Sequence, residues 1–183
     1  NAIKNLLKEN EGCAKIDIYE FKNRTNFKKE NITAIKDYDE FIIYQPFGTQ
    51  MFPDFLYFKF FDNYCILQTI EIKSSNGGTA TWNGNYPKEN GIYIYYDSKL
   101  NKITYFMGKT FINKKIKYII NICEQSIDIV IKFFNKYFEE NGIMWKKVHY
   151  RKTEHSNKIK RYINDDKNEE RMREVENYII KLY

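Results

Sequence analysis

The sequence is poor in the residues that build metal clusters and disulfide frameworks. Three cysteines stand far apart among 183 residues, at Cys13, Cys65 and Cys123. Their odd number and wide separation argue against a disulfide framework and a zinc site. We therefore expect buried free thiols in a reducing compartment, as in a cytoplasmic protein. The two histidines, His149 and His155, have no second ligand at metal-binding spacing, and we expect both at the surface.

Long apolar runs are also absent. No stretch of about 18 apolar residues occurs, and the start of the chain lacks the charged, apolar and small-residue pattern of a secretion signal. We therefore expect no membrane partner. The length and the 43% hydrophobic content predict a single compact domain over residues 1–183, with its core at about 41–140.

Basic residues outnumber acidic ones, 30 against 24, and give a net charge of +6. An excess of positive charge suits a polyanionic partner. A basic stretch follows Ile143 and carries one acid, Glu154. We expect this stretch to contact phosphates, and a solvated surface is the alternative. Its basic residues are Lys146, Lys147, Arg151, Lys152, Lys158, Lys160 and Arg161.

Hydrophobic periodicity predicts short elements in the first part of the chain. A helix is expected before Gly12, where apolar residues fall at helical spacing. Strands are expected at Ile16–Phe21 and, as a buried strand, at Phe41–Gln45. A further helix is expected after Asn31.

The second part of the chain predicts two strands and two helices. The strands are Ile92–Tyr96 and Lys102–Phe106. A long helix follows Asn113 and ends near Gly142. Its apolar face is wide, so we expect it to pack on the sheet and also on either the rest of the chain or a second subunit. A last helix, with apolar residues from Met172 to Leu182, is expected to serve packing or dimerisation.

Between these parts, the sequence predicts a hairpin whose register can be worked out. A two-residue turn at Asp62-Asn63 places Asp54 directly opposite Glu71. Their Cβ atoms would then lie about 5 Å apart. Lys73 points to the same face, because side chains alternate with a period of two. A bulge of one residue would move one set to the other face.

Two adjacent carboxylates near a backbone carbonyl are suited to Mg²⁺, which prefers oxygen ligands and keeps several waters. A Mg²⁺ ion can polarise a phosphoryl oxygen and stabilise a leaving oxygen. A neighbouring ammonium, here Lys73, can orient the attacking water or stabilise developing charge. The hairpin thus holds the groups that phosphodiester hydrolysis needs.

Pro53-Asp54 followed by Glu71-Ile72-Lys73 resembles the signature of PD-(D/E)xK nucleases. The surrounding QPFGTQMFPDF and EIKSSNGGTATWNGNYP are similar to type II restriction endonucleases of that superfamily, mainly over residues 41–106. The resemblance implies an α/β fold with a restriction-endonuclease-like core, in which helices flank a mixed central β-sheet. It also implies that Asp54, Glu71 and the Ile72 carbonyl hold Mg²⁺, while Lys73 assists the nucleophilic water.

The same resemblance implies cleavage of double-stranded DNA that leaves a 5′-phosphate and a 3′-hydroxyl. Two scissile strands suggest a homodimer, and residues 143–183 would form an extension that contacts DNA or mediates dimerisation. Many members of the superfamily carry a further acidic residue on an early helix. Glu30 is the candidate here, with Glu20 and Glu40 as alternatives.

The acid-x-Lys triplet by itself is not specific. It recurs at residues 20–22, 97–99 and 165–167. The triplet at 71–73 differs from these because it ends a continuous apolar strand downstream of the sole Pro-Asp pair. The alternative is that Glu71 and Lys73 are ordinary edge-strand charges while Asp54 caps a turn.

The long polar segment Ser74–Gly91 is the expected reader of DNA sequence, since loops of this length are often functional. Asn and Gln can contact adenine through two hydrogen bonds. Trp82 could stack on DNA, although a packing anchor for its own loop is favoured. The residues expected to contact DNA are Gln45, Gln50, Ser74, Thr79, Thr81, Trp82, Asn83, Asn85, Lys146, Lys147 and Arg151.

Other functions stay open at this point. A repair, nicking or Holliday-junction endonuclease would use the same three residues. A DNA-binding module without activity would keep the fold and bind DNA in a salt-dependent way. A protein-interaction domain with incidental charges would not bind DNA.

Overall fold

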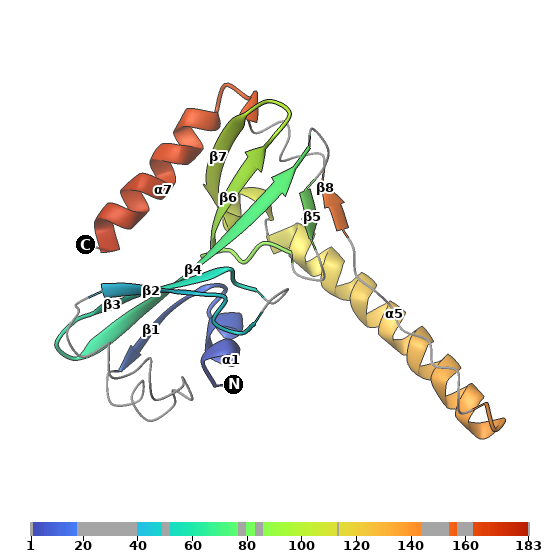
Figure 1. Cartoon of the computed structure of the whole chain (residues 1–183). Coiled ribbons are helices and arrows are strands. Elements are labelled where there is room, and N and C mark those ends of the chain that lie inside the picture. Colours follow the sequence, from blue (N-terminus) through green and yellow to red (C-terminus); the bar gives the residue numbers. More distant parts are fainter. Residues whose placement is uncertain are drawn as a thin grey trace.

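A six-stranded mixed sheet forms the centre of the computed structural model (Figure 1). The structure describes residues 2–17, 40–48, 52–76, 80–82, 86–112, 114–143, 154–156 and 163–182. The strands follow the order β2 (Glu40–Tyr44), β3 (Phe55–Phe60), β4 (Tyr64–Ser75), β6 (Ile92–Asp97) and β7 (Lys102–Met107), and β1 (Cys13–Asp17) also pairs with β4. The β4–β6 pair is parallel and the other pairs of this sheet are antiparallel. The predicted α/β class with a mixed central sheet is confirmed.

Strand β4 joins the two halves of the sheet. Its first half lies between β3 and β1, with Leu67 paired to Phe58 on one side and to Ala14 on the other. From Ile70 onward, β6 takes the edge that β1 has left. In Figure 1, the sheet accordingly divides into a lower part around β1 and β3 and an upper part around β6 and β7.

The chain approaches β4 closely where this change of partner takes place. Gly12 has a φ of 101°, and its carbonyl accepts hydrogen bonds from the backbone N–H and the hydroxyl of Thr69. A Cβ atom on Gly12 would lie 2.8 Å from the Thr69 Oγ1 and 3.0 Å from the Gly91 nitrogen. Glycine therefore satisfies both the backbone conformation and the space at this point. The predicted helix end near Gly12 is confirmed, since α1 spans Ala2–Glu9.

The core consists of clusters on the two halves of the sheet. Helix α1 buries Ile3 and Leu7 against β1, β3 and β4, and each such side chain contributes about 2 kcal/mol. Helix α7 (Asn168–Leu182) packs along β7, and its Val175 is buried with Met107. The predicted packing role of the last helix is confirmed.

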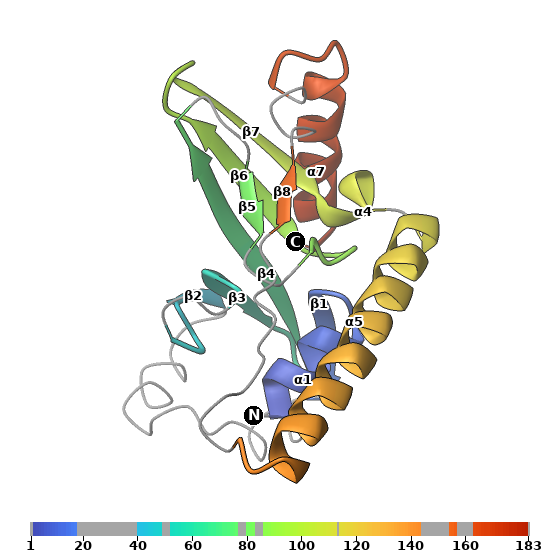
Figure 2. The same cartoon turned by 90° about the vertical axis from the view of Figure 1, so that its right-hand side faces the viewer.

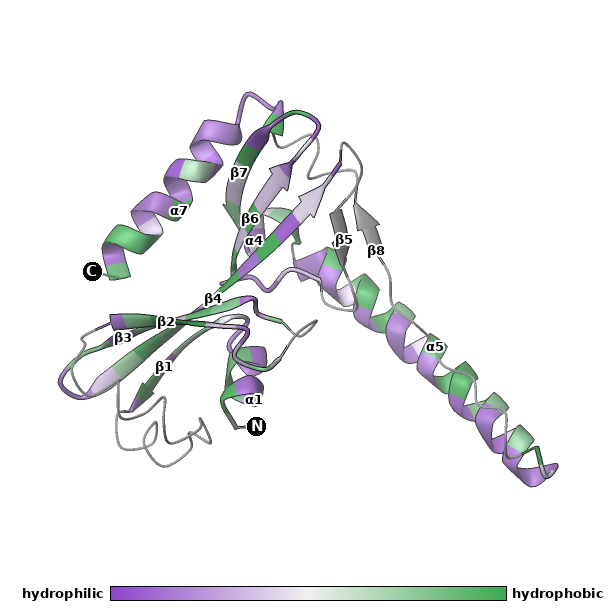
Figure 3. Ribbon diagram, viewed as in Figure 1, coloured by the Kyte–Doolittle hydropathy of each residue, from purple (hydrophilic) through white to green (hydrophobic). Residues whose placement is uncertain are grey.

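Helix α5 (Lys114–Glu140) projects away from the sheet (Figures 1 and 2). The short helix α4 (Gly108–Phe111) leads into it, and Gly142, with a φ of 70°, lies at its predicted end. Ile120 near its start packs against the core. Within the described part of the chain, no residue of α5 is buried. Apolar and polar residues alternate along it in Figure 3, and the large exposed apolar residues are Ile116, Tyr118, Ile119, Ile122, Ile129, Val130, Phe133, Phe134 and Tyr137.

Three expectations of burial and extent are corrected. Strand β2 is not buried: Ile42 and Tyr44 are 58% and 64% exposed, because β2 is an edge strand with one open face. Cys123 is exposed on α5 and Cys13 is partly exposed, whereas Cys65 is buried in the core. The strand expected from Ile16 already begins at Cys13, where it pairs with Gln68.

Two short strands lie apart from the central sheet. Strands β5 (Ala80–Trp82) and β8 (Glu154–Ser156) form a separate antiparallel pair. The helix expected after Asn31 lies outside the described residues. Among the helices that the structure describes, none has the length and apolarity needed to cross a membrane.

Candidate active site

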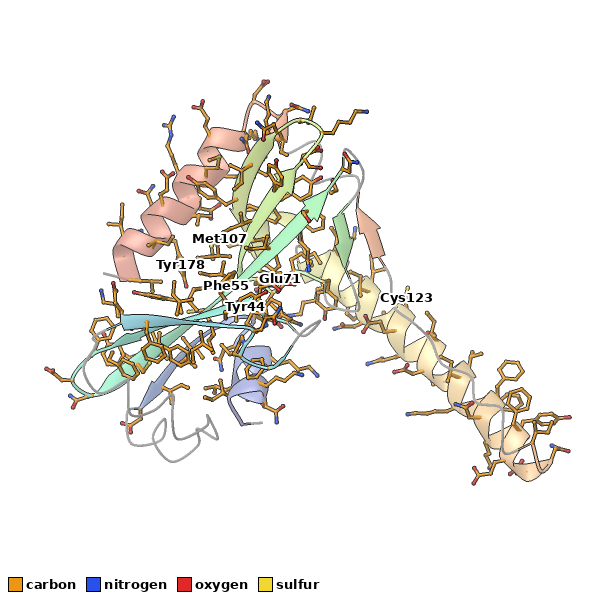
Figure 4. The ribbon with its side chains drawn as sticks, in the orientation of Figure 1. Tyr44, Phe55, Glu71, Met107, Cys123 and Tyr178 are labelled. Carbon is orange, nitrogen blue, oxygen red and sulfur yellow. The ribbon has the colours of Figure 1, made fainter. Side chains whose placement is uncertain are left out.

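The predicted hairpin register is confirmed. Phe60 pairs with Cys65, and Phe55 pairs with Ile70. The next opposed position brings together Asp54, directly before β3, and Glu71, in the second half of β4. Glu71 lies at the centre of the molecule in Figure 4, close to Phe55.

Hydrogen bonds connect the two carboxylates crosswise. The backbone N–H of Asp54 donates to the Glu71 Oε2 over 3.0 Å, and the backbone N–H of Ile72 donates to the Asp54 Oδ2 over 2.8 Å. The Lys73 ammonium lies 2.5 Å from the Glu71 Oε1. The three side chains thus converge, as the register predicted, and each carboxylate is oriented by the backbone of the opposite strand.

The environment of Glu71 opposes a free negative charge. Glu71 is 8% exposed. Burial raises the pKa of its carboxyl group, the nearby Lys73 ammonium lowers it, and the charge of Asp54 raises it again, with a net upward shift. A cation placed beside both carboxylates would remove the repulsion between them and favour the ionised form of Glu71.

The donor set fits a hard divalent cation. Mg²⁺ is commonly bound by one or two carboxylates while its other positions hold water and substrate oxygens. Asp54 and Glu71 supply two such groups from neighbouring strands. Among the described residues, no group of three or more His, Cys, Asp and Glu side chains could hold a metal. A cage made only of side chains, as in structural metal sites, is therefore not found in this part of the chain.

Two of the residues expected to contact DNA lie beside these groups. The Gln45 backbone N–H donates to the Asp54 carbonyl over 2.7 Å, and the Gln45 side chain donates to the Tyr44 hydroxyl over 2.9 Å. Ser74 follows Lys73 on β4 and is exposed. Thr81 and Trp82 lie on β5. The others lie outside the described residues: Gln50, Thr79, Asn83, Asn85, Lys146, Lys147 and Arg151.

Glu40 is not part of the site. It begins β2 and pairs with Lys59, whereas Tyr44 at the other end of the strand pairs with Phe55. Four residues of strand correspond to about 13 Å, and the Glu40 carboxylate accepts a hydrogen bond from the Tyr57 hydroxyl instead. This alternative for the additional acidic residue is wrong. Glu20 and Glu30 lie outside the described residues.

Two other acid-x-Lys triplets have local structural roles. The Asp97 Oδ1 accepts the backbone N–H groups of Lys99 and Leu100 in the β6–β7 turn. The Asp165 Oδ1 accepts the backbone N–H of Lys167. In both, the carboxylate caps its own turn. The triplet at residues 20–22 lies outside the described residues.

Sequence reasoning missed Tyr93 as a support of the site. Tyr93 is paired with Glu71 across the parallel strands, stacks on Phe52 at a ring distance of 6.4 Å, and accepts the backbone N–H of Lys88 over 2.7 Å. Burial raises the pKa of its hydroxyl, so it stays protonated. The pairing of β4 with β6 spans a long connection, and no local pattern in the sequence specifies it.

Comparison with known proteins gives no match: no protein-family model, no curated protein and no solved structure is similar to this chain. Functional inference therefore depends on the geometry and chemistry of the site.

Proposed function

We propose that the protein is a Mg²⁺-dependent endonuclease that cleaves double-stranded DNA at specific sites, as a type II restriction endonuclease of the PD-(D/E)xK superfamily does. The restriction-endonuclease-like identity of the core is part of this proposal. The observation that supports it is the convergence of Asp54, Glu71 and Lys73 from two strands onto one point of the sheet. Products with a 5′-phosphate and a 3′-hydroxyl follow from the same proposal.

Each residue has a defined task in this reaction. Asp54, Glu71 and the Ile72 carbonyl would hold Mg²⁺, which supplies a Lewis acid toward the phosphoryl oxygens. Lys73, beside Glu71, orients the attacking water and stabilises negative charge on the phosphorus centre. The crosswise hydrogen bonds fix both carboxylates before DNA binds, so little reorganisation is needed.

The proposal extends to a homodimer, because a duplex has two scissile strands and each subunit offers one site. The exposed apolar residues of α5 are compatible with a subunit contact. Double-stranded DNA is the proposed partner, and the basic stretch after Ile143 supplies contacts to its phosphates.

Plasmid cleavage tests the proposal. We expect wild-type protein with Mg²⁺ to cut plasmid DNA into discrete fragments, and a chelator to stop the reaction. Asp54→Ala and Lys73→Ala should abolish cleavage while the circular dichroism spectrum stays unchanged. Lys99→Ala, from a triplet that caps a turn, is the matched control and should cleave normally. Undiminished cleavage by both Asp54→Ala and Lys73→Ala would overturn the assignment.

The same digestion separates the alternatives. Nicks or cuts that depend on DNA structure would favour a repair, nicking or junction enzyme with the same residues. DNA binding that weakens steeply with salt, without cleavage under any divalent cation, would favour a binding module.

A further inference from the structure

A small basic cavity lies next to the proposed active site. Its volume is about 120 Å³, and it lies between α1, the β2–β3 connection and the segment before β6. Pro53, which directly precedes Asp54, forms part of its wall. We call this cavity the lysine pocket, and its main lining residues are Lys4, Lys8, Lys88, Phe47, Phe52 and Pro53.

Separate parts of the chain hold the lysines at this pocket. Lys4 and Lys8 are one turn apart on α1, and Leu7 between them is 2% exposed and anchors the helix in the core. Lys88 is fixed through its backbone: its N–H donates to the Tyr93 hydroxyl, and its carbonyl accepts the Gly91 N–H over 2.9 Å. The pocket is thus built on core elements.

The position of Lys88 depends on a close backbone approach. A Cβ atom on Gly108 would lie 1.9 Å from the Lys88 carbonyl oxygen. Only glycine leaves room for the chain at this point. The backbone of Lys88 therefore packs against the start of α4 and is hydrogen-bonded to Tyr93. The backbone position from which the Lys88 side chain extends is thus fixed.

Charged side chains of both signs lie around Lys88. Burial lowers the pKa of its ammonium group, Glu11 raises it, the neighbouring Lys117 and Lys8 lower it, and Glu124 raises it, with a net downward shift. The Glu11 carboxylate accepts a hydrogen bond from the Lys117 ammonium over 2.6 Å. The negative charge of Glu11 therefore acts on both Lys117 and Lys88. An anion in the pocket would relieve the repulsion between Lys8 and Lys88 and stabilise both ammonium groups.

The remaining walls are apolar and consist of Leu7, Phe47, Phe52 and Pro53, while Tyr86 lies outside the lining. The Lys4 ammonium lies 5.9 Å from the centre of the Phe47 ring, and the Lys88 ammonium lies 4.7 Å from the centre of the Tyr86 ring. Aromatic faces can hold an ammonium group without neutralising it. The pocket is therefore a positively charged recess with apolar walls, next to a pair of carboxylates.

We propose that the lysine pocket binds a phosphate group of the nucleic acid backbone, adjacent to the phosphate positioned at Asp54 and Glu71. This inference rests on the proposed nuclease function for the source of the phosphate. The volume supports it, because pockets for drug-sized ligands measure roughly 300–1,000 Å³, so a single phosphate group fits better than a nucleotide. A terminal phosphate on a DNA strand has the same chemistry and is the other source.

Binding of inorganic phosphate tests the pocket without any cleavage. We expect wild-type protein to bind inorganic phosphate in calorimetric titrations, and Lys8→Gln/Lys88→Gln to bind it at least tenfold more weakly. Lys99→Gln/Lys132→Gln, which changes two exposed lysines in the β6–β7 turn and on α5, is the control for net charge and should bind as wild type does. Equal phosphate affinity in wild type and the double variant, with both folded by circular dichroism, would overturn the proposal.

Binding to DNA identifies the source of the phosphate. With Ca²⁺ in place of Mg²⁺, affinity for a closed DNA circle should fall in the double variant. The slope of log affinity against log salt should also decrease by about 0.9 for each DNA phosphate that the variant no longer neutralises. Weaker binding seen only with duplexes that carry a 5′-phosphate would overturn the backbone placement and assign the pocket to strand ends.

The two proposals fail in different ways. If phosphate binding depends on the lysines but the protein cleaves no DNA under any divalent cation, the nuclease assignment fails and the phosphate pocket stands. If wild type and the double variant cleave DNA equally and bind phosphate equally, the pocket assignment fails and the nuclease stands.

Discussion

Two acid-x-Lys triplets begin on the parallel strands β4 and β6, and they differ in how their carboxylates are bound. Glu71 and Asp97 are both buried, at 8% and 0% exposure. Asp97 accepts N–H groups from its own turn, at Lys99 and Leu100. Glu71 instead accepts the backbone N–H of Asp54, directly before β3, and is paired with the Lys73 ammonium. Burial alone does not distinguish the two acids, whereas the origin of their partners does.

The difference follows from the position of each acid in its strand. Asp97 is the last residue of β6, so the chain turns back and offers its own N–H groups. Glu71 lies four residues before the end of β4 at Ser75, and its backbone is paired with Tyr93 of the neighbouring strand β6. One partner of its side chain, the Asp54 N–H, therefore comes from across the sheet, and the other, Lys73, lies on the same strand. We interpret the first arrangement as structural and the second as catalytic.

The largest effect is expected from removing the charge of Glu71, with removal of the charge of Asp97 as the matched comparison. Glu71→Gln preserves the shape of the side chain but loses the charge that a cation needs and one of the two oxygens that accept hydrogen bonds. Mg²⁺-dependent plasmid cleavage should therefore slow by at least about 100-fold. Asp97→Asn should cleave within a few-fold of wild type. Single-turnover assays measure both cleavage rates. Equal slowing by Asp97→Asn and Glu71→Gln would contradict the distinction between a structural and a catalytic acid.

A smaller effect, on stability, is expected at Asp97. Asp97→Ala leaves two backbone N–H groups of the β6–β7 turn without their carboxylate partner, which should lower the free energy of unfolding by about 1–3 kcal/mol. Urea denaturation measures this decrease. Lys99→Gln in the same turn should change the free energy of unfolding by less than about 0.5 kcal/mol. Equal stability of Asp97→Ala and wild type would remove the structural interpretation of this triplet.

The local part of the site could be predicted from sequence, because a short turn determines the register of the strands on either side of it. Asp62-Asn63 placed Asp54 opposite Glu71, and the structure has this register. Helical periodicity likewise located α5 and α7, since that signal lies within each segment.

Features that depend on distant contacts could not be predicted. The parallel pairing of β4 with β6 joins segments separated by a long connection, so Tyr93 beside Glu71 had no local signal. The lysine pocket combines Lys4 and Lys8 of α1 with Lys88. The burial of β2 could not be predicted either. Its apolar run predicts a buried strand, but its position at the sheet edge leaves one face exposed.

Divalent-cation binding tests the central claim most directly, because it needs neither DNA nor turnover. Mn²⁺ accepts the same oxygen ligands as Mg²⁺ and can be followed by electron paramagnetic resonance. We expect wild-type protein and Asp97→Asn to bind Mn²⁺ with equal affinity, and Asp54→Asn and Glu71→Gln to bind it at least tenfold more weakly. Unchanged Mn²⁺ affinity in Asp54→Asn and Glu71→Gln would contradict the assignment of these two carboxylates as metal ligands.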